Sequence, residues 1–174
     1  MSDLRPIGVP IRFAGSDRRF LFSFETIDEL QSRYRDKSVF DLMEQAMENT
    51  VEGLTMIIDM VDVLCHGEIE RSEIPRQLSV NTLTGEGSLQ QVRYAVSQAL
   101  IESMPQPRED EIITEEGSGI MEINKFMIIA TSKFGLSEKE AWELTPRKFG
   151  LLNDAYMTVN GMRAEETMSL SQLP

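Results

Sequence analysis

Hydrophobic residues alternate with other residues near the start of the chain, in two short runs separated by a turn. The first run spans residues 7–13, and the second spans 20–24, where phenylalanine occupies every other position. Gly15-Ser16-Asp17 between them has the residue types of a turn. Because strand side chains point alternately to the two faces, this pattern predicts a β-hairpin. Pro10 cannot donate a backbone hydrogen bond, so the first strand should lie on an edge or begin at Ile11.

After the hairpin the hydrophobic period changes to that of amphipathic helices. Thr26 with Glu29 three residues later is a capping-box pattern, which predicts that a short helix begins there. Ser38 is placed to cap a second helix, which should end near Asn49. The clearest helical period lies in 54–65, where apolar residues recur at intervals of three and four. These residues are Leu54, Ile57, Ile58, Val61, Leu64 and Cys65.

A polar stretch interrupts the helical pattern after Gly67, which is a typical helix stop. Residues 68–87 read as a long connection, in which 74–83 holds a short element that the pattern does not assign. Ser88 with Gln91 then predicts another capped helix, with its apolar residues facing inward.

Hydrophobic periodicity is absent from 105–119, where the chain is acidic and rich in Pro and Gly. This composition is typical of a flexible linker. Three further helices are predicted beyond it: one that ends at Gly135, one capped by Ser137, and one that begins with Thr145-Pro146. Residues 162–174 show no sustained pattern, which predicts a disordered tail.

Together these elements predict a mainly α protein, with an N-terminal β-hairpin followed by a helical bundle and a small helical C-terminal domain. The predicted hairpin plus helical domain spans 1–104, and the acidic flexible linker spans 105–119. The small helical domain follows at 120–161, and the tail at 162–174 completes the chain.

The chain of 174 residues contains 17 Lys and Arg against 29 Asp and Glu, which gives a formal net charge of −12. Nucleic-acid affinity comes largely from cations that displace counterions from phosphate, so this charge disfavours DNA and RNA as partners. It disfavours anionic membrane surfaces likewise. A run of about 18 apolar residues, as a membrane span requires, is missing. The start of the chain lacks the apolar segment of a signal peptide. We therefore expect a soluble, cytoplasmic protein with no nucleic acid and no membrane partner.

Candidate catalytic and ligand-binding groups are sparse. Cys65 and His66 are the single cysteine and the single histidine. Adjacent residues on a helix point about 100 degrees apart and do not form an activated pair. Residues 85–87 precede a predicted helix as phosphate-binding loops do, but neither a hydrophobic strand before them nor a lysine after them completes that motif. We predict that the chain is not an enzyme and uses no cofactor and no metal.

Methionine is frequent, with 11 residues in the chain. In the second predicted helix, Phe40, Met43 and Met47 form one stripe. Thioether side chains are flexible and polarisable, so such a stripe either fills the core or forms an adaptable surface for a protein partner. The sequence leaves both interpretations open, and on the second one these three residues are candidate partner-binding residues.

The two helices that flank Thr145-Pro146 admit another interpretation. A helix, a short turn and a second helix that begins with Arg147 and Lys148 have the order of a helix-turn-helix DNA-binding unit. Two cations on so acidic a chain favour a packed helical pair instead. A helix-turn-helix DNA-binding regulator is therefore the alternative rather than the main interpretation.

The order of these parts resembles that of phage tail assembly chaperones. The matching features are the hairpin with residues 20–24, the helix beginning Thr26-Ile27-Asp28-Glu29-Leu30, the longer helix ending Leu64-Cys65-His66-Gly67, and the acidic linker. After the linker, Phe134-Gly135-Leu136-Ser137, Trp142 and Thr145-Pro146 are similar to the C-terminal extension of the long forms in this family. The resemblance spans roughly residues 7–161.

This resemblance implies a non-catalytic protein of the host cytoplasm that binds the tape measure protein of a long-tailed bacteriophage. It further implies that the chain recruits tail tube protein during tail assembly and is absent from the mature virion. Trp142, Thr145 and Pro146 are the partner-binding candidates that it adds. A structural tail completion or connector protein retained in the virion is the second alternative. The sequence leaves open whether the chain forms a homo-oligomer.

Overall fold

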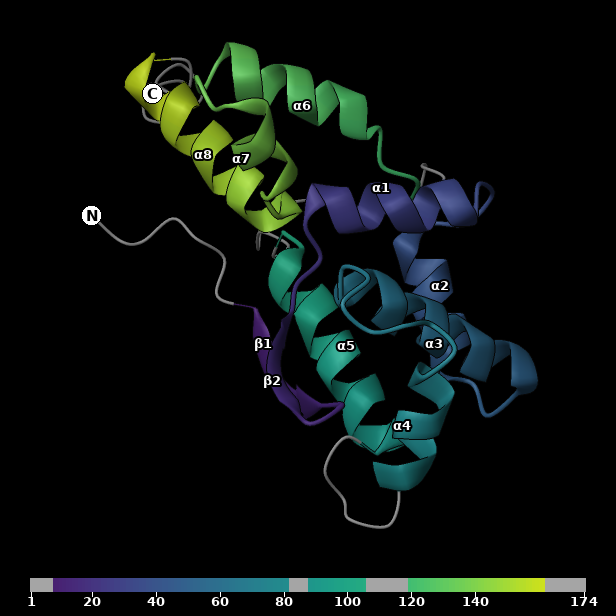
Figure 1. The fold of residues 1–174 in the computed structure, drawn as a ribbon. Coiled ribbons are helices and arrows are strands. Elements are labelled where there is room, and N and C mark those ends of the chain that lie inside the picture. The colour runs from purple at the N-terminus through teal and green to yellow at the C-terminus, as the bar shows by residue number, and fades with distance from the viewer. Residues whose placement is uncertain (1–7, 82–87, 106–118, 162–174) are drawn as a thin grey trace, which may run out of the picture.

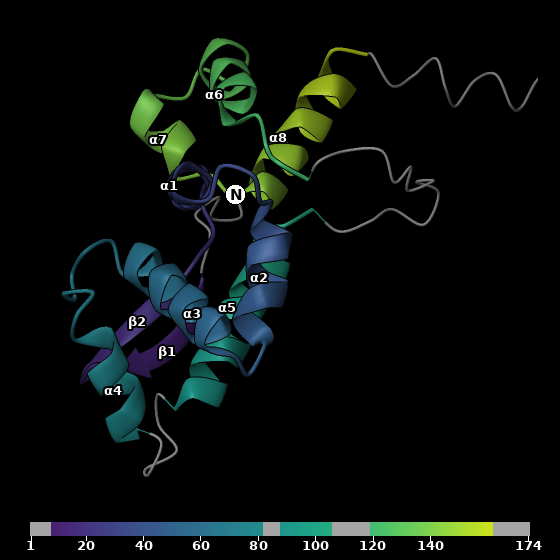
Figure 2. The same cartoon turned by 90° about the vertical axis from the view of Figure 1, so that its right-hand side faces the viewer.

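The computed structural model describes residues 8–81, 88–105 and 119–161. Within these residues the fold is mainly helical, with one antiparallel pair of strands at the N-terminal side, as the sequence predicts. Figures 1 and 2 show α1 between two groups of elements. The hairpin and α3, α4 and α5 lie on one side of α1, and α6, α7 and α8 lie on the other. No helix among the described residues is long and apolar enough to cross a bilayer.

The predicted hairpin is confirmed, but its turn and second strand lie earlier than expected. Strand β1 (Val9–Phe13) pairs with β2 (Ser16–Phe20), with Val9 opposite Phe20. The loop is Ala14-Gly15, and both residues have positive φ, of 51° and 75°. Positive φ at both loop positions matches the right-handed twist of paired strands, which explains why the loop is this short. Pro10 lies in β1, which is an edge strand because the sheet has two strands.

Helix α1 (Phe24–Arg33) begins before the predicted Thr26 cap. Ser23 is the N-cap, and its side chain accepts the hydrogen bond from the backbone N–H of Thr26. The capping-box prediction for Thr26 was therefore wrong. A hydroxyl three residues earlier already satisfies the free amide, so the helix begins one turn sooner.

Helices α2 (Val39–Met47) and α3 (Val51–Leu64) meet at a three-residue corner. Ser38 caps α2 in a capping box with Asp41, as predicted, and Thr50 caps α3. Most of α3 is buried, because α1, α2, α4 and α5 all pack against it. Leu54, the first residue of the predicted helical period, is exposed, whereas Met56, which is not part of that period, is buried.

The connection predicted at 68–87 contains helix α4 (Ile74–Asn81), whose Ile74 and Leu78 are buried. Residues 82–87 lie outside the described part of the chain. Ser88 then caps α5 (Leu89–Ser103), as predicted. Helix α5 packs against both strands as well as α3 and α4. It therefore forms the centre of the first segment, which we define as the described residues up to 105.

Beyond the predicted linker, most of which lies outside the described residues, come α6 (Ile123–Ser132), α7 (Glu138–Trp142) and α8 (Pro146–Val159). Ser137 and Thr145 cap α7 and α8, as predicted. Positive φ at Gly135 follows the end of α6. The local signals of this segment therefore agree with its structure.

The three C-terminal helices pack on α1 rather than standing apart. The backbone N–H of Phe24 donates to the carbonyl of Leu144 at 2.8 Å, and the Gln31 amide bonds both backbone groups of Met121 at 2.9 Å. The Phe24 ring stacks on that of Phe126, with centroids 5.2 Å apart. Residues 120–161 thus share one hydrophobic core with the first segment. Whether they also act as a separate domain stays a prediction.

A polar network lies within this core. Asp59 of α3 is buried and accepts a hydrogen bond from the Tyr34 hydroxyl. Its other carboxylate oxygen forms an ion pair with Arg71 at 2.5 Å. Burial, reinforced by the bond to Asp59, raises the pKa of Tyr34 to about 12. The network ties α1 and the segment before α4 to the middle of α3.

Candidate functional site

The groups that first suggest chemistry do not assemble into a site. Cys65 is buried at the end of α3, and burial raises the pKa of its thiol to about 11. His66 is the next residue, with a positive φ of 49°, and its side chain is exposed. No group of three or more His, Cys, Asp or Glu in the described part of the chain is placed to hold a metal. The loop at 85–87 lies outside that part.

The predicted stripe on α2 divides between core and surface. Phe40 is 51% exposed and Met47 is 37% exposed, whereas Met43 is 9% exposed and packs in the core. Positions 40 and 47 are seven residues apart and share one helix face. Met43 lies on the same stripe but packs in the core. Two of the three candidates therefore lie where a partner has access, and the third is a core residue.

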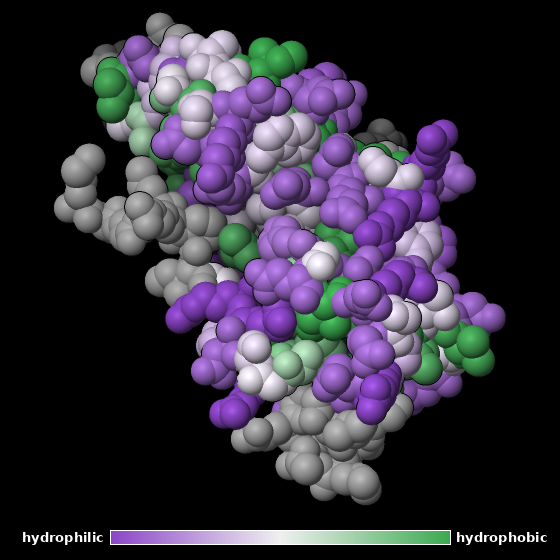
Figure 3. Space-filling view, viewed as in Figure 1, coloured by the Kyte–Doolittle hydropathy of each residue, from purple (hydrophilic) through white to green (hydrophobic). Residues whose placement is uncertain are grey.

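Two further exposed apolar side chains follow the corner in the sequence. Val51 and Leu54, in the first turns of α3, are 77% and 39% exposed. We call Phe40, Met47, Val51 and Leu54 the corner surface. Figure 3 shows a largely hydrophilic molecule with separate hydrophobic patches, one of them at the right-hand edge beside the meeting point of α2 and α3. Val51 lies three residues before Leu54 and continues the period at 54–65, but it was not included in that predicted run.

The corner itself is held by hydrogen bonds and close packing. Arg93 of α5 donates to the Asn49 side chain at 2.7 Å and to the Glu48 carbonyl at 2.5 Å. Gly53 lies so close to the end of α2 that an added Cβ would stand 2.7 Å from the carbonyl oxygen of Gln45. The apolar side chains of the corner surface are therefore presented on a fixed backbone.

The three C-terminal candidates also have different surroundings. Thr145 is buried, and its hydroxyl accepts the hydrogen bond from the backbone N–H of Lys148 at 3.2 Å. Pro146 is buried at the first position of α8. Both residues therefore begin the helix. Trp142 is only partly buried, at the end of α7, and it is the one of the three that is open to a ligand.

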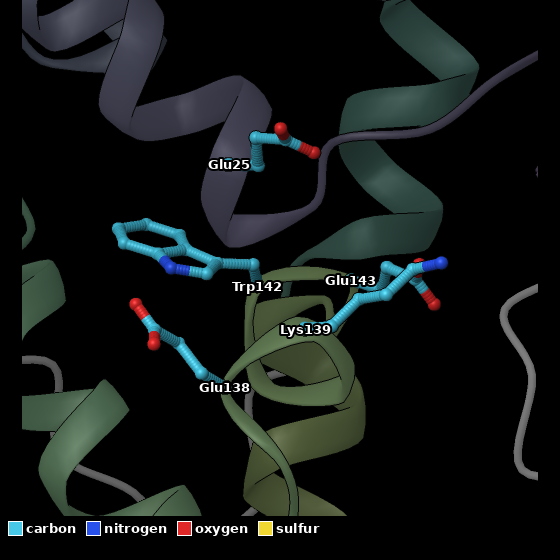
Figure 4. Close-up of a pocket in the computed structure, with 5 residues that line it drawn as sticks. All are labelled: Glu25, Glu138, Lys139, Trp142 and Glu143. Carbon is cyan, nitrogen blue, oxygen red and sulfur yellow. The ribbon is translucent and has the colours of Figure 1, made fainter.

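Trp142 lines two adjoining open grooves at the junction of α1 and α7. One groove, of about 390 Å³, is formed with Glu25, Glu138, Lys139 and Glu143. The other, of about 400 Å³, is lined by Glu25, Asp28, Glu29, Ser32 and Trp142. Figure 4 shows the indole between Glu25 on α1 and Glu138 on α7, with Lys139 and Glu143 extending to the other side. We call the two together the Trp142 groove.

Negative charge predominates around this indole. Glu29 forms an ion pair with Arg33 at 2.5 Å, and Glu143 lies 3.9 Å from Lys139. The other three carboxylates that line the groove are those of Glu25, Asp28 and Glu138. Among the described residues they form no ion pair, so their negative charge is available to a ligand in the groove.

The helix pair α7–α8 has the order of a helix-turn-helix, but its exposed face is poor in cations. Arg147 is exposed at the start of α8, and the positions that follow it on the same face are the exposed Leu151, Ala155 and Val159. Phe149 is buried and forms one aromatic cluster with the rings of Phe24, Phe126 and Phe134. Helix α8 therefore presents apolar side chains where a recognition helix would present cations.

Comparisons with protein families, with known proteins and with solved structures found no match to this chain.

Proposed function

We propose that the chain is a non-catalytic tail assembly chaperone that binds the tape measure protein of a long-tailed bacteriophage and recruits tail tube protein. It acts in the host cytoplasm and leaves before the virion is complete. The corner surface is the observation that supports this proposal best. It offers exposed apolar side chains on two helices of a protein whose net charge is −12.

An amphipathic helix is the partner element that such a surface suits. Met47 and Phe40 lie two turns apart on α2, and Val51 and Leu54 are exposed in the first turns of α3. Apolar side chains spaced along a helix contact a partner helix at its own i, i+3, i+4 and i+7 positions. A long tape measure protein has coiled-coil-like apolar stripes that self-associate unless another helix covers them. The corner surface would cover one such stripe.

The overall charge supports the same role. A high negative net charge keeps a complex in solution when one partner is prone to aggregate. The C-terminal helices, joined to the first segment through 106–118, add a second surface at which the tube protein is captured. Two surfaces on one chain raise the effective concentration of the second partner once the first is bound.

Co-expression with the tape measure protein encoded beside this chain's gene tests the proposal. We expect the tape measure protein to stay soluble and to co-purify with the wild-type chain. The double variant Phe40→Ser/Val51→Ser should lose most of this co-purification, because burial of each large apolar side chain contributes roughly 1.5–3 kcal/mol. The control Leu151→Ser/Val159→Ser removes two exposed apolar side chains from α8 and should leave tape measure binding unchanged.

Four results would contradict the proposal. The tape measure protein could remain insoluble with the wild-type chain, or bind the corner variant as well as the wild type. Purified mature particles that contain the chain would favour the tail completion or connector protein. Affinity for duplex DNA that falls steeply with salt would favour the helix-turn-helix regulator.

A further inference from the structure

The Trp142 groove combines two features that recognise organic cations. The face of an indole attracts a cation placed over it, and it does so more strongly than phenol or benzene rings do. Glu25 and Asp28 of α1 and Glu138 of α7 line the groove around the indole. The aromatic face and the carboxylates thus occupy one place in the fold.

We propose that the Trp142 groove binds an arginine side chain in an extended segment of a protein partner. A guanidinium is planar, so it stacks on the indole while its N–H groups donate to carboxylates at the ring edge. Each groove, at about 390 and 400 Å³, is at the lower end of the roughly 300–1,000 Å³ range of small-ligand sites. This volume suits single side chains rather than a folded element.

The charges in the groove set the chemistry of this occupant. The groove carries more negative than positive charge. The two nearby cations, Arg33 and Lys139, already lie beside Glu29 and Glu143. The carboxylates of Glu25, Asp28 and Glu138 are additional to these pairs. Acidic side chains of a partner are therefore repelled, and cationic ones are favoured. A bare metal ion is a poorer occupant, since no three metal-binding side chains converge among the described residues and an indole face favours organic cations.

This inference goes beyond the proposed function and does not depend on it. The tape measure protein is expected at the corner surface on α2 and α3, whereas the groove lies between α1 and α7. The groove is tested with a synthetic peptide, so its result and the result of the co-expression experiment are separate.

Tryptophan fluorescence provides a direct assay, because Trp142 is the single tryptophan of the chain. The full chain is titrated at low salt with the peptide acetyl-Gly-Arg-Gly-Arg-Gly-amide. We expect a saturable change in emission that weakens as salt is added. The same peptide with Glu in place of Arg should cause no change. No emission change with the arginine peptide would overturn the proposal.

Two variants of equal net charge separate a specific site from general attraction to an acidic protein. Glu25→Gln/Asp28→Asn/Glu138→Gln should weaken binding by roughly 3- to 100-fold, because the binding free energies of three charge pairs are lost together. The control replaces three exposed carboxylates elsewhere, in the variant Glu44→Gln/Glu52→Gln/Glu102→Gln, and should change affinity less than about 2-fold. Equal weakening in both variants would overturn the proposal.

The contribution of the ring is measured separately by calorimetry. Trp142→Phe keeps an aromatic ring but weakens the cation–π attraction, so affinity for the arginine peptide should fall about 2- to 30-fold. A circular dichroism melt checks that the variant is folded. A folded Trp142→Phe protein with wild-type affinity would overturn the role of the indole. If it does not fold, the two exposed carboxylate variants decide the question.

Discussion

Replacement of Gly53 by alanine should destabilise the protein, although the same change in another helix should stabilise it. Both Gly53 in α3 and Gly150 in α8 lie inside helices with ordinary backbone angles. Alanine is preferred over glycine in helix interiors by about 1 kcal/mol. Helix propensity alone therefore predicts a gain in stability for both variants.

The surroundings reverse this sign at Gly53. A Cβ added there would stand 2.7 Å from the Gln45 carbonyl oxygen and closer still to that of Glu48. Both are backbone atoms at the end of α2, so they cannot rotate away as a side chain does. Overpacking typically costs about 1–3 kcal/mol, and two backbone contacts place this site at the upper end. Less the propensity gain, we expect Gly53→Ala to lower the free energy of unfolding by about 2 kcal/mol.

Gly150 is the matched control. Nothing lies within 4 Å of the position that its Cβ would take. Gly150→Ala should therefore raise the free energy of unfolding by roughly 0.5–1 kcal/mol. Urea unfolding, monitored by Trp142 fluorescence and by circular dichroism, measures the stability of both variants. An unchanged m-value shows that a variant exposes the same surface on unfolding as the wild type, so that the free energies can be compared. A Gly53→Ala protein as stable as the wild type would refute the close approach of α2 and α3.

Three further predictions concern the polar network and the buried thiol. Asp59→Asn should lower the free energy of unfolding by roughly 1.5–3 kcal/mol, because the amide keeps an acceptor for Tyr34 but removes the negative charge that strengthens this bond and pairs with Arg71. Urea unfolding measures the change, and a wild-type value would contradict the network. The pKa of Tyr34 is raised to about 12, so its extra stabilisation should be fully present below pH 10 and be lost as pH rises to about 12. The difference in unfolding free energy between wild type and Tyr34→Phe across this range measures the effect, and a constant difference would argue against it. Cys65 should react with a thiol reagent at pH 8 about 100-fold or more slowly in the folded protein than in the unfolded chain, because its pKa is raised to about 11. Equal reaction rates in the folded and unfolded protein would show that the thiol is accessible and contradict this prediction.

Helix caps were the most predictable part of the fold. Ser38, Ser88, Ser137 and Thr145 each cap the helix that the sequence assigns to them. A cap bond joins residues three apart, so the sequence contains both partners. The exception is Thr26, where Ser23 supplies an equivalent hydroxyl one turn earlier. Ser23 and Thr26 are both residue types that cap helices, so the local sequence does not decide which of them begins α1.

Helix α4 lies where the sequence indicated a short element at 74–83 but did not assign its type. Its sequence is short and weakly patterned, and it gains stability by burying Ile74 and Leu78 against α3 and α5. A helix of eight residues is marginal by itself in water. Its formation therefore depends on neighbours that the local sequence does not show.

The candidate surfaces were predictable only in part. The stripe on α2 correctly included Phe40 and Met47, but it could not show that Met43 packs in the core. Trp142 was a candidate by resemblance alone. Glu25 lies more than a hundred residues before it in the chain, and nothing in the local pattern indicates that the two line one groove.

The sequence by itself determined the hairpin, the alternation of helices and breaks, most helix starts and the acidic charge. The charge follows from composition alone, and the other features depend on residues close together in the chain. The tertiary structure decided which apolar faces are covered, as in the stacking of Phe24 on Phe126 and the exposure of Leu54. Amphipathic periodicity shows that a helix has an apolar face, but burial of that face requires a partner. The partner is selected by packing between segments far apart in the chain.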